Sequence, residues 1–126
     1  MEEEIKMALE ARKHAHCKIY KVGALLKMRS GKCYTGCNID NFGIQSICAE
    51  RVAFSKAISE GEYDFEYIIV AGGVPDSDTL DKCLPCGYCR QFMFEFVDKN
   101  FKIYAYFDGK LNEYTLEELL PESFSL

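Results

Sequence analysis

Residues 48–72, CAERVAFSKAISEGEYDFEYIIVAG, contain the clearest structural signals in the chain. The first part predicts a helix from Cys48 to Gly61, because small apolar residues recur at the spacing of one helix face and a glycine follows as a stop signal. The last part, residues 65–72, is an apolar run typical of a buried strand. A helix that leads directly into a buried strand indicates a sheet covered by helices.

The flanking segments extend this alternation in both directions. Apolar runs at residues 20–28 and 33–38 enclose the turn RSGK and predict a hairpin. Beyond the polar loop that follows residue 72, residues 86–100 predict a second helix and residues 101–107 a further strand. The terminal elements predicted are a helix over residues 3–14, a turn at Asp108-Gly109 leading into a short strand, and a helix opened by the capping box Thr115-Leu116-Glu117-Glu118.

This order of elements predicts the α/β class, as a three-layer α/β/α fold. The central sheet should have about five strands and be mixed, because a hairpin pairs antiparallel strands whereas strands joined through a helix run parallel. The length of 126 residues is typical of one domain, so we expect residues 1–126 to form a single domain.

The amino-acid composition limits the classes of molecule that we expect the protein to bind. Asp and Glu outnumber Lys and Arg by 20 to 15, a balance that argues against nucleic acid polymers, because such binding depends on basic side chains. A free small molecule is the expected substrate. No apolar run approaches the ~20 residues of a membrane span and no leader segment is visible, so we expect no membrane association and a cytoplasmic location. In that reducing compartment, the seven cysteines would serve as thiols or metal ligands rather than as disulfides.

Two short motifs combine residues that can bind a metal. They are CAE at residues 48–50 and PCGYC at residues 85–89, and each stands where a predicted helix begins. Cys86 and Cys89 are three residues apart, so both side chains lie on one face of a first helical turn and can hold one ion. The positive end of a helix lowers the pKa of nearby thiols and favours the thiolates that zinc requires.

Three cysteine ligands leave a tetrahedral zinc ion with one open position, as in catalytic sites rather than closed structural ones. Glu50 stands two residues after Cys48, and its side chain is long enough to hold a water or a substrate instead of the ion. Three cysteines with a glutamate that does not bind the metal are the known pattern of zinc-dependent deaminases.

Two other interpretations of the cysteines remain open. Cys33 and Cys37 could join Cys86 and Cys89 in a closed structural site, which would leave Cys48 without a role. A redox pair at residues 86–89 is the second interpretation, although the chain lacks the strand that normally leads into such a motif. Under the three-cysteine interpretation, free thiols are expected at Cys17, Cys33, Cys37 and Cys83.

Motifs along nearly the whole chain resemble the cytidine deaminase family. They are VGALL at residues 22–26, GCNIDN at 36–41, CAER at 48–51, PCGYCRQ at 85–91 and LLPESF at 119–124. The length is similar to that of the small homotetrameric members. The resemblance implies a cytidine deaminase-like fold, a Zn²⁺ cofactor and a homotetramer. It also implies hydrolysis of cytidine or deoxycytidine to the uridine nucleoside and ammonia, a reaction of pyrimidine salvage.

The same resemblance implies a role for each site residue. Cys48, Cys86 and Cys89 would hold zinc, and Glu50 would carry protons between water and the pyrimidine. Arg51 would donate hydrogen bonds to the ligand sulfurs and offset the excess negative charge of three thiolates. The substrate-binding residues implied are Tyr20 and the Ala49 backbone at the base, Asn38 and Asp40 at the ribose, and Phe124 in the pocket of a neighbouring subunit.

Several positions depart from the family pattern. Tyr20 stands where a Phe is usual, Asp40 where a Glu is usual, and Tyr88 where the residue is usually small. The segment FGIQSI, residues 42–47, is one residue shorter than in many relatives. We therefore expect a more permissive pocket and leave open a blasticidin-type or N4-modified cytosine nucleoside deaminase. A structural zinc module without catalysis is the alternative from another class.

Overall fold

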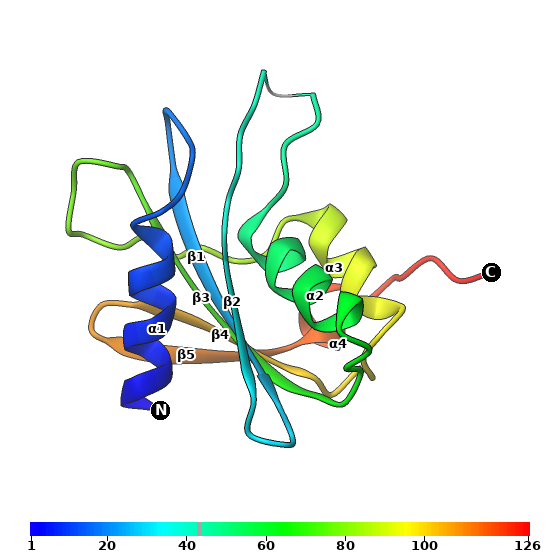
Figure 1. Cartoon of the computed structure of the whole chain (residues 1–126). Helices are drawn as coiled ribbons and strands as arrows, with labels where there is room; N and C mark the ends of the chain where they lie inside the picture. Colours follow the sequence, from blue (N-terminus) through cyan, green and yellow to red (C-terminus); the bar gives the residue numbers. More distant parts are fainter. Residues whose placement is uncertain (43) are drawn as a thin grey trace.

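The computed structural model describes residues 1–42 and 44–126 and is built on a five-stranded sheet (Figure 1). The strand order is β2-β1-β3-β4-β5. Only the β3–β4 pair is parallel among these neighbours, so the sheet is mixed, as predicted. The strands are β1 (Lys21–Met28), β2 (Cys33–Cys37), β3 (Phe65–Gly73), β4 (Lys102–Phe107) and β5 (Lys110–Thr115).

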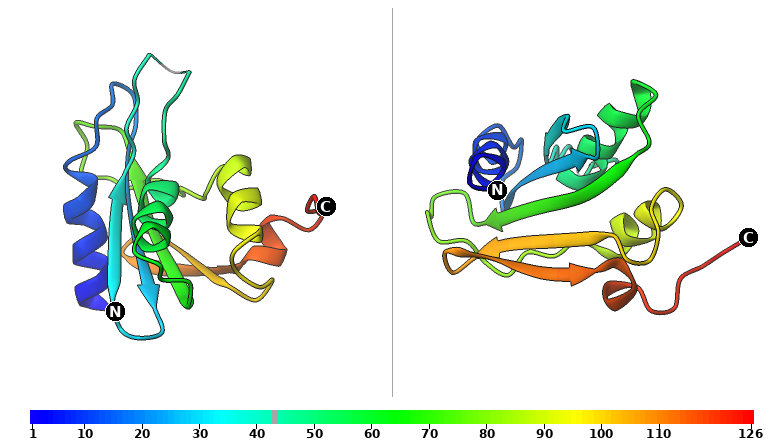
Figure 2. Two further views of the ribbon diagram at one scale, coloured as in Figure 1. Left: turned by 45° about the vertical axis from the view of Figure 1, so that its right-hand side comes forward. Right: turned by 90° about the horizontal axis from the view of Figure 1, so that it is seen from below.

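Helices cover both faces of the sheet (Figure 2). Helix α1 (Glu2–Arg12) packs on one face against β1, β2 and β3, and α2 (Ala49–Ser59) packs on the other against β1 and β2. The last two helices, α3 (Gly87–Phe94) and α4 (Leu116–Leu119), lie on the same side as α2. The three-layer α/β/α prediction is therefore confirmed. In the described part of the chain, no helix is both long and apolar enough to cross a membrane.

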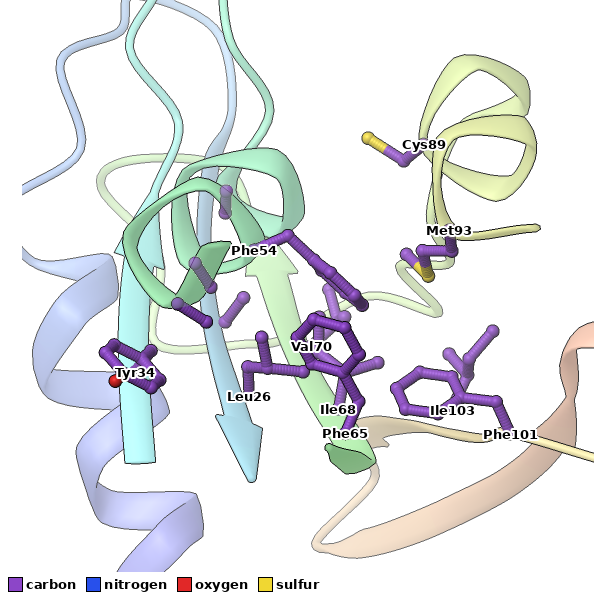
Figure 3. Packing of buried hydrophobic residues seen from close by; sticks show 14 of the residues in the cluster. Leu26, Tyr34, Phe54, Phe65, Ile68, Val70, Cys89, Met93, Phe101 and Ile103 are labelled. Carbon is purple, nitrogen blue, oxygen red and sulfur yellow. The ribbon is translucent and has the colours of Figure 1, made fainter. Parts of the chain in front are cut away.

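The main hydrophobic core lies between the sheet and α2 and α3 (Figure 3). Phe54 of α2 is fully buried at its centre, and its ring lies 4.8 Å from that of Phe65, 6.2 Å from that of Phe92 and 6.1 Å from that of Phe101, measured between centroids. Aromatic pairs at these separations stabilise a fold beyond the area they bury. Because the four rings come from α2, β3, α3 and the residue just before β4, the core fixes both helices against the sheet.

Two glycines on neighbouring strands allow helices to approach the sheet closely. A Cβ atom at Gly36 would collide with the backbone of Ala49 and Ala53 on α2. One at Gly23 would collide with the backbone of Ala8 and Arg12 on α1, on the opposite face. The absence of a side chain at Gly36 thus determines how near the first turn of α2 lies to β2.

Local turn signals in the second half of the chain are mostly confirmed. Thr115 and Glu118 form the predicted capping box, and Asp108 and Gly109 have φ values of 54° and 70°, as a tight hairpin turn requires. The second predicted helix is shorter than expected and ends at Phe94 instead of residue 100. Asp98 accounts for the last part of this difference, residues 98–100. Its carboxylate accepts a hydrogen bond from the Asn100 amide at 3.0 Å and stabilises a local turn instead of helix.

Candidate metal centre and catalytic site

Three cysteine sulfurs meet where α2 and α3 begin. Cys48 is the N-cap of α2, Cys86 is the N-cap of α3, and Cys89 follows in the first turn of α3. All three Sγ atoms lie within 4.8 Å of one another, and those of Cys48 and Cys86 are 3.6 Å apart. Figure 3 shows the Cys89 side chain pointing from α3 toward α2. The structure thus brings together the three predicted ligands from segments 38 residues apart in sequence.

This arrangement fits a zinc ion. Zinc–sulfur bonds of about 2.3 Å in a tetrahedron place sulfurs about 3.8 Å apart, close to the observed Cys48–Cys86 separation. Hydrogen bonding from Cys89 lowers the pKa of the Cys48 thiol, and Arg51 and Cys86 contribute in the same direction. The same Cys48–Cys89 interaction raises the pKa of Cys89. Three crowded sulfurs oppose one another's ionisation, and a dication between them removes that conflict.

Glu50 lies beside this group at the start of α2 and is only 3 % exposed. Burial raises the pKa of its carboxyl to about 7, and the nearby Cys48 sulfur acts in the same direction. A carboxyl group with a pKa near the working pH can both accept and donate a proton. Glu50 is not among the residues grouped as potential metal ligands, and its role in proton transfer stays a prediction.

Two arginines make contacts at or next to the cysteine group. The guanidinium of Arg51 lies 3.7 Å from Cys48 Sγ through one of its terminal nitrogens, as a charge-offsetting group would. Arg90 donates hydrogen bonds to the carbonyls of Pro85 at 2.6 Å and Leu119 at 2.8 Å. The second arginine therefore ties the loop that precedes Cys86 to α4. Sequence reasoning missed it, although its position directly after Cys89 was a usable signal.

The predicted ribose-binding residues lie together at the end of β2. Asn38 is 8 % exposed, and its amide is engaged with the backbone, accepting from Val22 N and donating to Tyr20 O, both at 2.8 Å. Its Nδ2 also lies 3.4 Å from each oxygen of Asp40. Asn38 thus positions Asp40, whose carboxylate is the more accessible of the two. Asp40 borders a surface hollow of about 870 Å³ that is also lined by residues 16–19.

The shortened loop follows Asn38 and Asp40 along the chain. Ile39 and Ile47 exchange two backbone hydrogen bonds of 3.0 Å, which fix the base of the loop. Phe42 is fully exposed at the loop's outer part, and Ile44 nearly so. Gly43, part of the segment whose length departs from the family pattern, lies outside the described residues. Phe42 and Ser46 of this loop form part of the wall of that hollow.

Tyr20 belongs to a cluster that the sequence did not predict. Its hydroxyl donates a hydrogen bond to Asp81 Oδ2 at 3.1 Å, and Cys83 lies beside it. Burial raises the pKa of the Cys83 thiol to about 12, and it is not part of the cysteine group that could hold a metal. The contacts are long-range in sequence, since Tyr20 and Asp81 are 61 positions apart, so no local pattern reveals them.

The other two predicted substrate-binding residues are Ala49, at the start of α2, and Phe124, near the C-terminus. Ala49 is fully buried as the first residue of α2, next to Cys48. Phe124 is 67 % exposed, on a C-terminal segment that extends away from the sheet (Figure 1). The Gln91 side chain binds the backbone of Phe124 through two hydrogen bonds, at 2.9 and 3.0 Å. The Phe124 ring is therefore presented outward.

The alternative metal site with four cysteines is not formed. Cys33 and Cys37 lie on β2, and neither belongs to the group of potential ligands found among the described residues. The three-cysteine group that is formed would leave an open fourth position on a tetrahedral ion. The arrangement thus offers three sulfurs to one metal ion and places a buried carboxyl group beside them.

Comparisons with known proteins agree with this geometry. A cytidine deaminase of Halalkalibacterium halodurans is 40 % identical over 126 residues, covering 96 % of this chain and 91 % of that protein. A blasticidin-S deaminase of Bacillus cereus is 33 % identical, covering 98 % of this chain and 86 % of that protein. The crystal structure of a cytidine deaminase from Burkholderia pseudomallei superimposes with a TM-score of 0.83 at 30 % identity, over 98 % of both chains. Residues 1–105 match the family described as the cytidine and deoxycytidylate deaminase zinc-binding region, and the chain belongs to that family.

Proposed function

We propose that the protein is a zinc-dependent hydrolase that converts cytidine or deoxycytidine to the uridine nucleoside and ammonia. The observation that carries this proposal is the buried Glu50 carboxyl beside a three-cysteine group. The related cytidine deaminases named above support the choice of substrate.

The proposed ligands Cys48, Cys86 and Cys89 would hold a zinc ion that, when bound, supplies Lewis acidity and lowers the pKa of water at its open position. Glu50 would accept a proton from the attacking water at a carboxylate oxygen and deliver it to the pyrimidine ring nitrogen N3. The same carboxyl would pass the second proton to the exocyclic amine, which leaves as ammonia. Burial of Glu50 excludes bulk water, so the proton is transferred to the substrate rather than to solvent.

Substrate contacts follow from the residues around this centre. The Asp40 carboxylate, held by Asn38, would accept hydrogen bonds from ribose hydroxyls. Tyr20 and the Ala49 backbone would contact the base. Phe124, presented outward by Gln91, would complete the pocket of a neighbouring subunit in a homotetramer. Residues 1–126 would form one deaminase domain acting in pyrimidine salvage, and the free thiols are compatible with the reducing cytoplasm.

A second candidate activity is deamination of a modified cytosine nucleoside such as blasticidin S. The similarity to a blasticidin-S deaminase and the surface hollow beside Asp40 favour it. Ultraviolet absorbance during incubation with cytidine, deoxycytidine, blasticidin S and N4-alkylated cytidines would separate the candidates. We expect the highest kcat/KM with cytidine or deoxycytidine. Preference for blasticidin S would establish the second activity. If the zinc-loaded protein converts none of these nucleosides, the remaining interpretation is a structural zinc module without catalysis.

A further inference from the structure

Arg51 reaches the ligand sulfurs with few firm hydrogen bonds. One terminal nitrogen lies 3.7 Å from Cys48 Sγ and 3.4 Å from the carbonyl oxygen of Ser46. Its Nε is buried and has no hydrogen-bond partner among the residues that the structure describes. The bond to the Ser46 oxygen is long for an N–H···O hydrogen bond, and neither contact uses Nε, so these two contacts fix the plane of the guanidinium only weakly. A further contact can therefore decide how that plane lies.

Tyr88 provides that contact. The centroid of its ring lies 4.2 Å from Arg51 Cζ, within the range of a cation–π interaction. Tyr88 sits in the first turn of α3 between Cys86 and Cys89, whereas Arg51 belongs to α2. The tyrosine is 66 % exposed, so little else packs around it. Its ring contacts the guanidinium and links the starts of the two helices that carry the cysteines.

The consequence for the metal centre is electrostatic. Three thiolates exceed the charge of Zn²⁺ by one, and Arg51 offsets that excess only while it stays close to the sulfurs. An aromatic ring against the guanidinium takes the place of water there and lowers the local dielectric constant, which strengthens the attraction. A small side chain at position 88 would give water access to the same face of Arg51.

We propose that Tyr88 is a positioning residue that holds Arg51 against the ligand sulfurs and thereby slows the loss of zinc. The proposal rests on the zinc site of the proposed function, but not on the identity of the substrate. It assigns a role to a residue that departs from the family's usual small side chain.

The test is the rate of zinc transfer from zinc-loaded protein to an excess of the colorimetric chelator 4-(2-pyridylazo)resorcinol. Tyr88→Leu should release zinc about twofold to fivefold faster than wild type, the effect expected for loss of one exposed cation–π contact. Tyr88→Phe retains the ring and should release zinc at nearly the wild-type rate. Tyr114→Leu is the matched control, because the Tyr114 ring contacts Lys82, at 5.9 Å, and not Arg51. It should also behave as wild type.

A double-mutant comparison shows whether Tyr88 acts through Arg51. In an Arg51→Gln background, Tyr88→Leu should no longer accelerate zinc release, because there is no guanidinium to hold. Equal release from wild type and Tyr88→Leu, with one zinc per chain in each, would overturn the role of Tyr88 alone. An equal acceleration with and without Arg51 would also overturn it. Wild-type protein that binds no zinc would overturn the proposed function as well. If Tyr88→Leu does not fold, Tyr88→Met replaces it.

Discussion

Zinc retention tests the cysteine assignment one side chain at a time. Cys86→Ser should reduce zinc affinity more than about a hundredfold, since changes to groups around zinc ligands already cost about 10–100-fold. Cys17→Ser and Cys83→Ser should keep one zinc per chain, because neither residue belongs to the cysteine group. Metal analysis after gel filtration gives the result. Zinc lost from Cys83→Ser but kept by Cys86→Ser would require a different ligand set.

The buried thiol of Cys83 leads us to predict that the free energy of unfolding depends on pH. Burial raises the pKa of its thiol to about 12, whereas an unfolded cysteine titrates near 8.5. Between these values the folded protein binds the proton more tightly than the unfolded chain. The stability present below pH ~8.5 should therefore fall as pH rises, by up to about 1.4 kcal/mol per pH unit.

Urea unfolding of wild type and Cys83→Val at pH 7.5 and pH 10 measures this contribution. Valine is apolar and has no proton to lose, so the variant should lose less stability between the two pH values. An identical loss in both proteins would show that Cys83 is not the group that titrates.

The two helix-contacting glycines give a matched test of how β2 places the first turn of α2. Gly36→Ala should destabilise the fold by about 1–3 kcal/mol, as overpacking does, and should also weaken zinc binding because it displaces the first turn of α2. Gly23→Ala should cost a similar free energy of unfolding but displace α1, on the face away from the cysteines. Thermal unfolding and zinc affinity of both variants check this. Equal zinc affinities would show that α2 adjusts without moving its ligand.

Local signals explain which elements the sequence could predict. The helix that follows Cys48, the strand at residues 65–72 and the capping box at Thr115 each depend on residues close in sequence, and all three are confirmed. The length of α3 was wrong in part because a side-chain turn at Asp98 competes with helix. Helix continuation and such a turn require the same backbone groups, and periodicity alone does not distinguish them.

The same distinction between local and long-range contacts applies to the candidate site. The meeting of Cys48, Cys86 and Cys89 could be predicted because each of the two motifs is confined to a few residues at a helix start. The Tyr20–Asp81 pair, the contact of Arg90 with Leu119 and the Arg51–Tyr88 stack join segments far apart in the chain. They depend on how the sheet and helices pack, so only the folded chain reveals them.

Assembly is the prediction that belongs to the whole molecule. A pocket completed by Phe124 of another chain requires an oligomer, and we expect the protein to elute at the mass of a tetramer rather than at 14.4 kDa. Phe124→Ala should raise KM about tenfold or more, because it removes an aromatic contact with substrate. A fully active monomer in gel filtration would contradict this arrangement.

Mixed oligomers show whether Phe124 acts across subunits. Phe124→Ala chains retain Glu50, and Glu50→Gln chains retain Phe124, so hybrids formed by refolding the two together contain some complete sites. At low cytidine concentration the mixture should exceed the summed activity of the separate variants. No gain would show that Phe124 serves only its own chain.

The deamination rate of zinc-loaded Glu50→Gln beside wild type tests the central claim most directly. The wild type should convert cytidine to uridine. The variant should keep its fold and one zinc per chain but lose about 10²–10⁴-fold in kcat, because glutamine cannot carry the proton. Near-normal turnover by the variant, or no conversion of cytidine by the zinc-loaded wild type, would contradict the account.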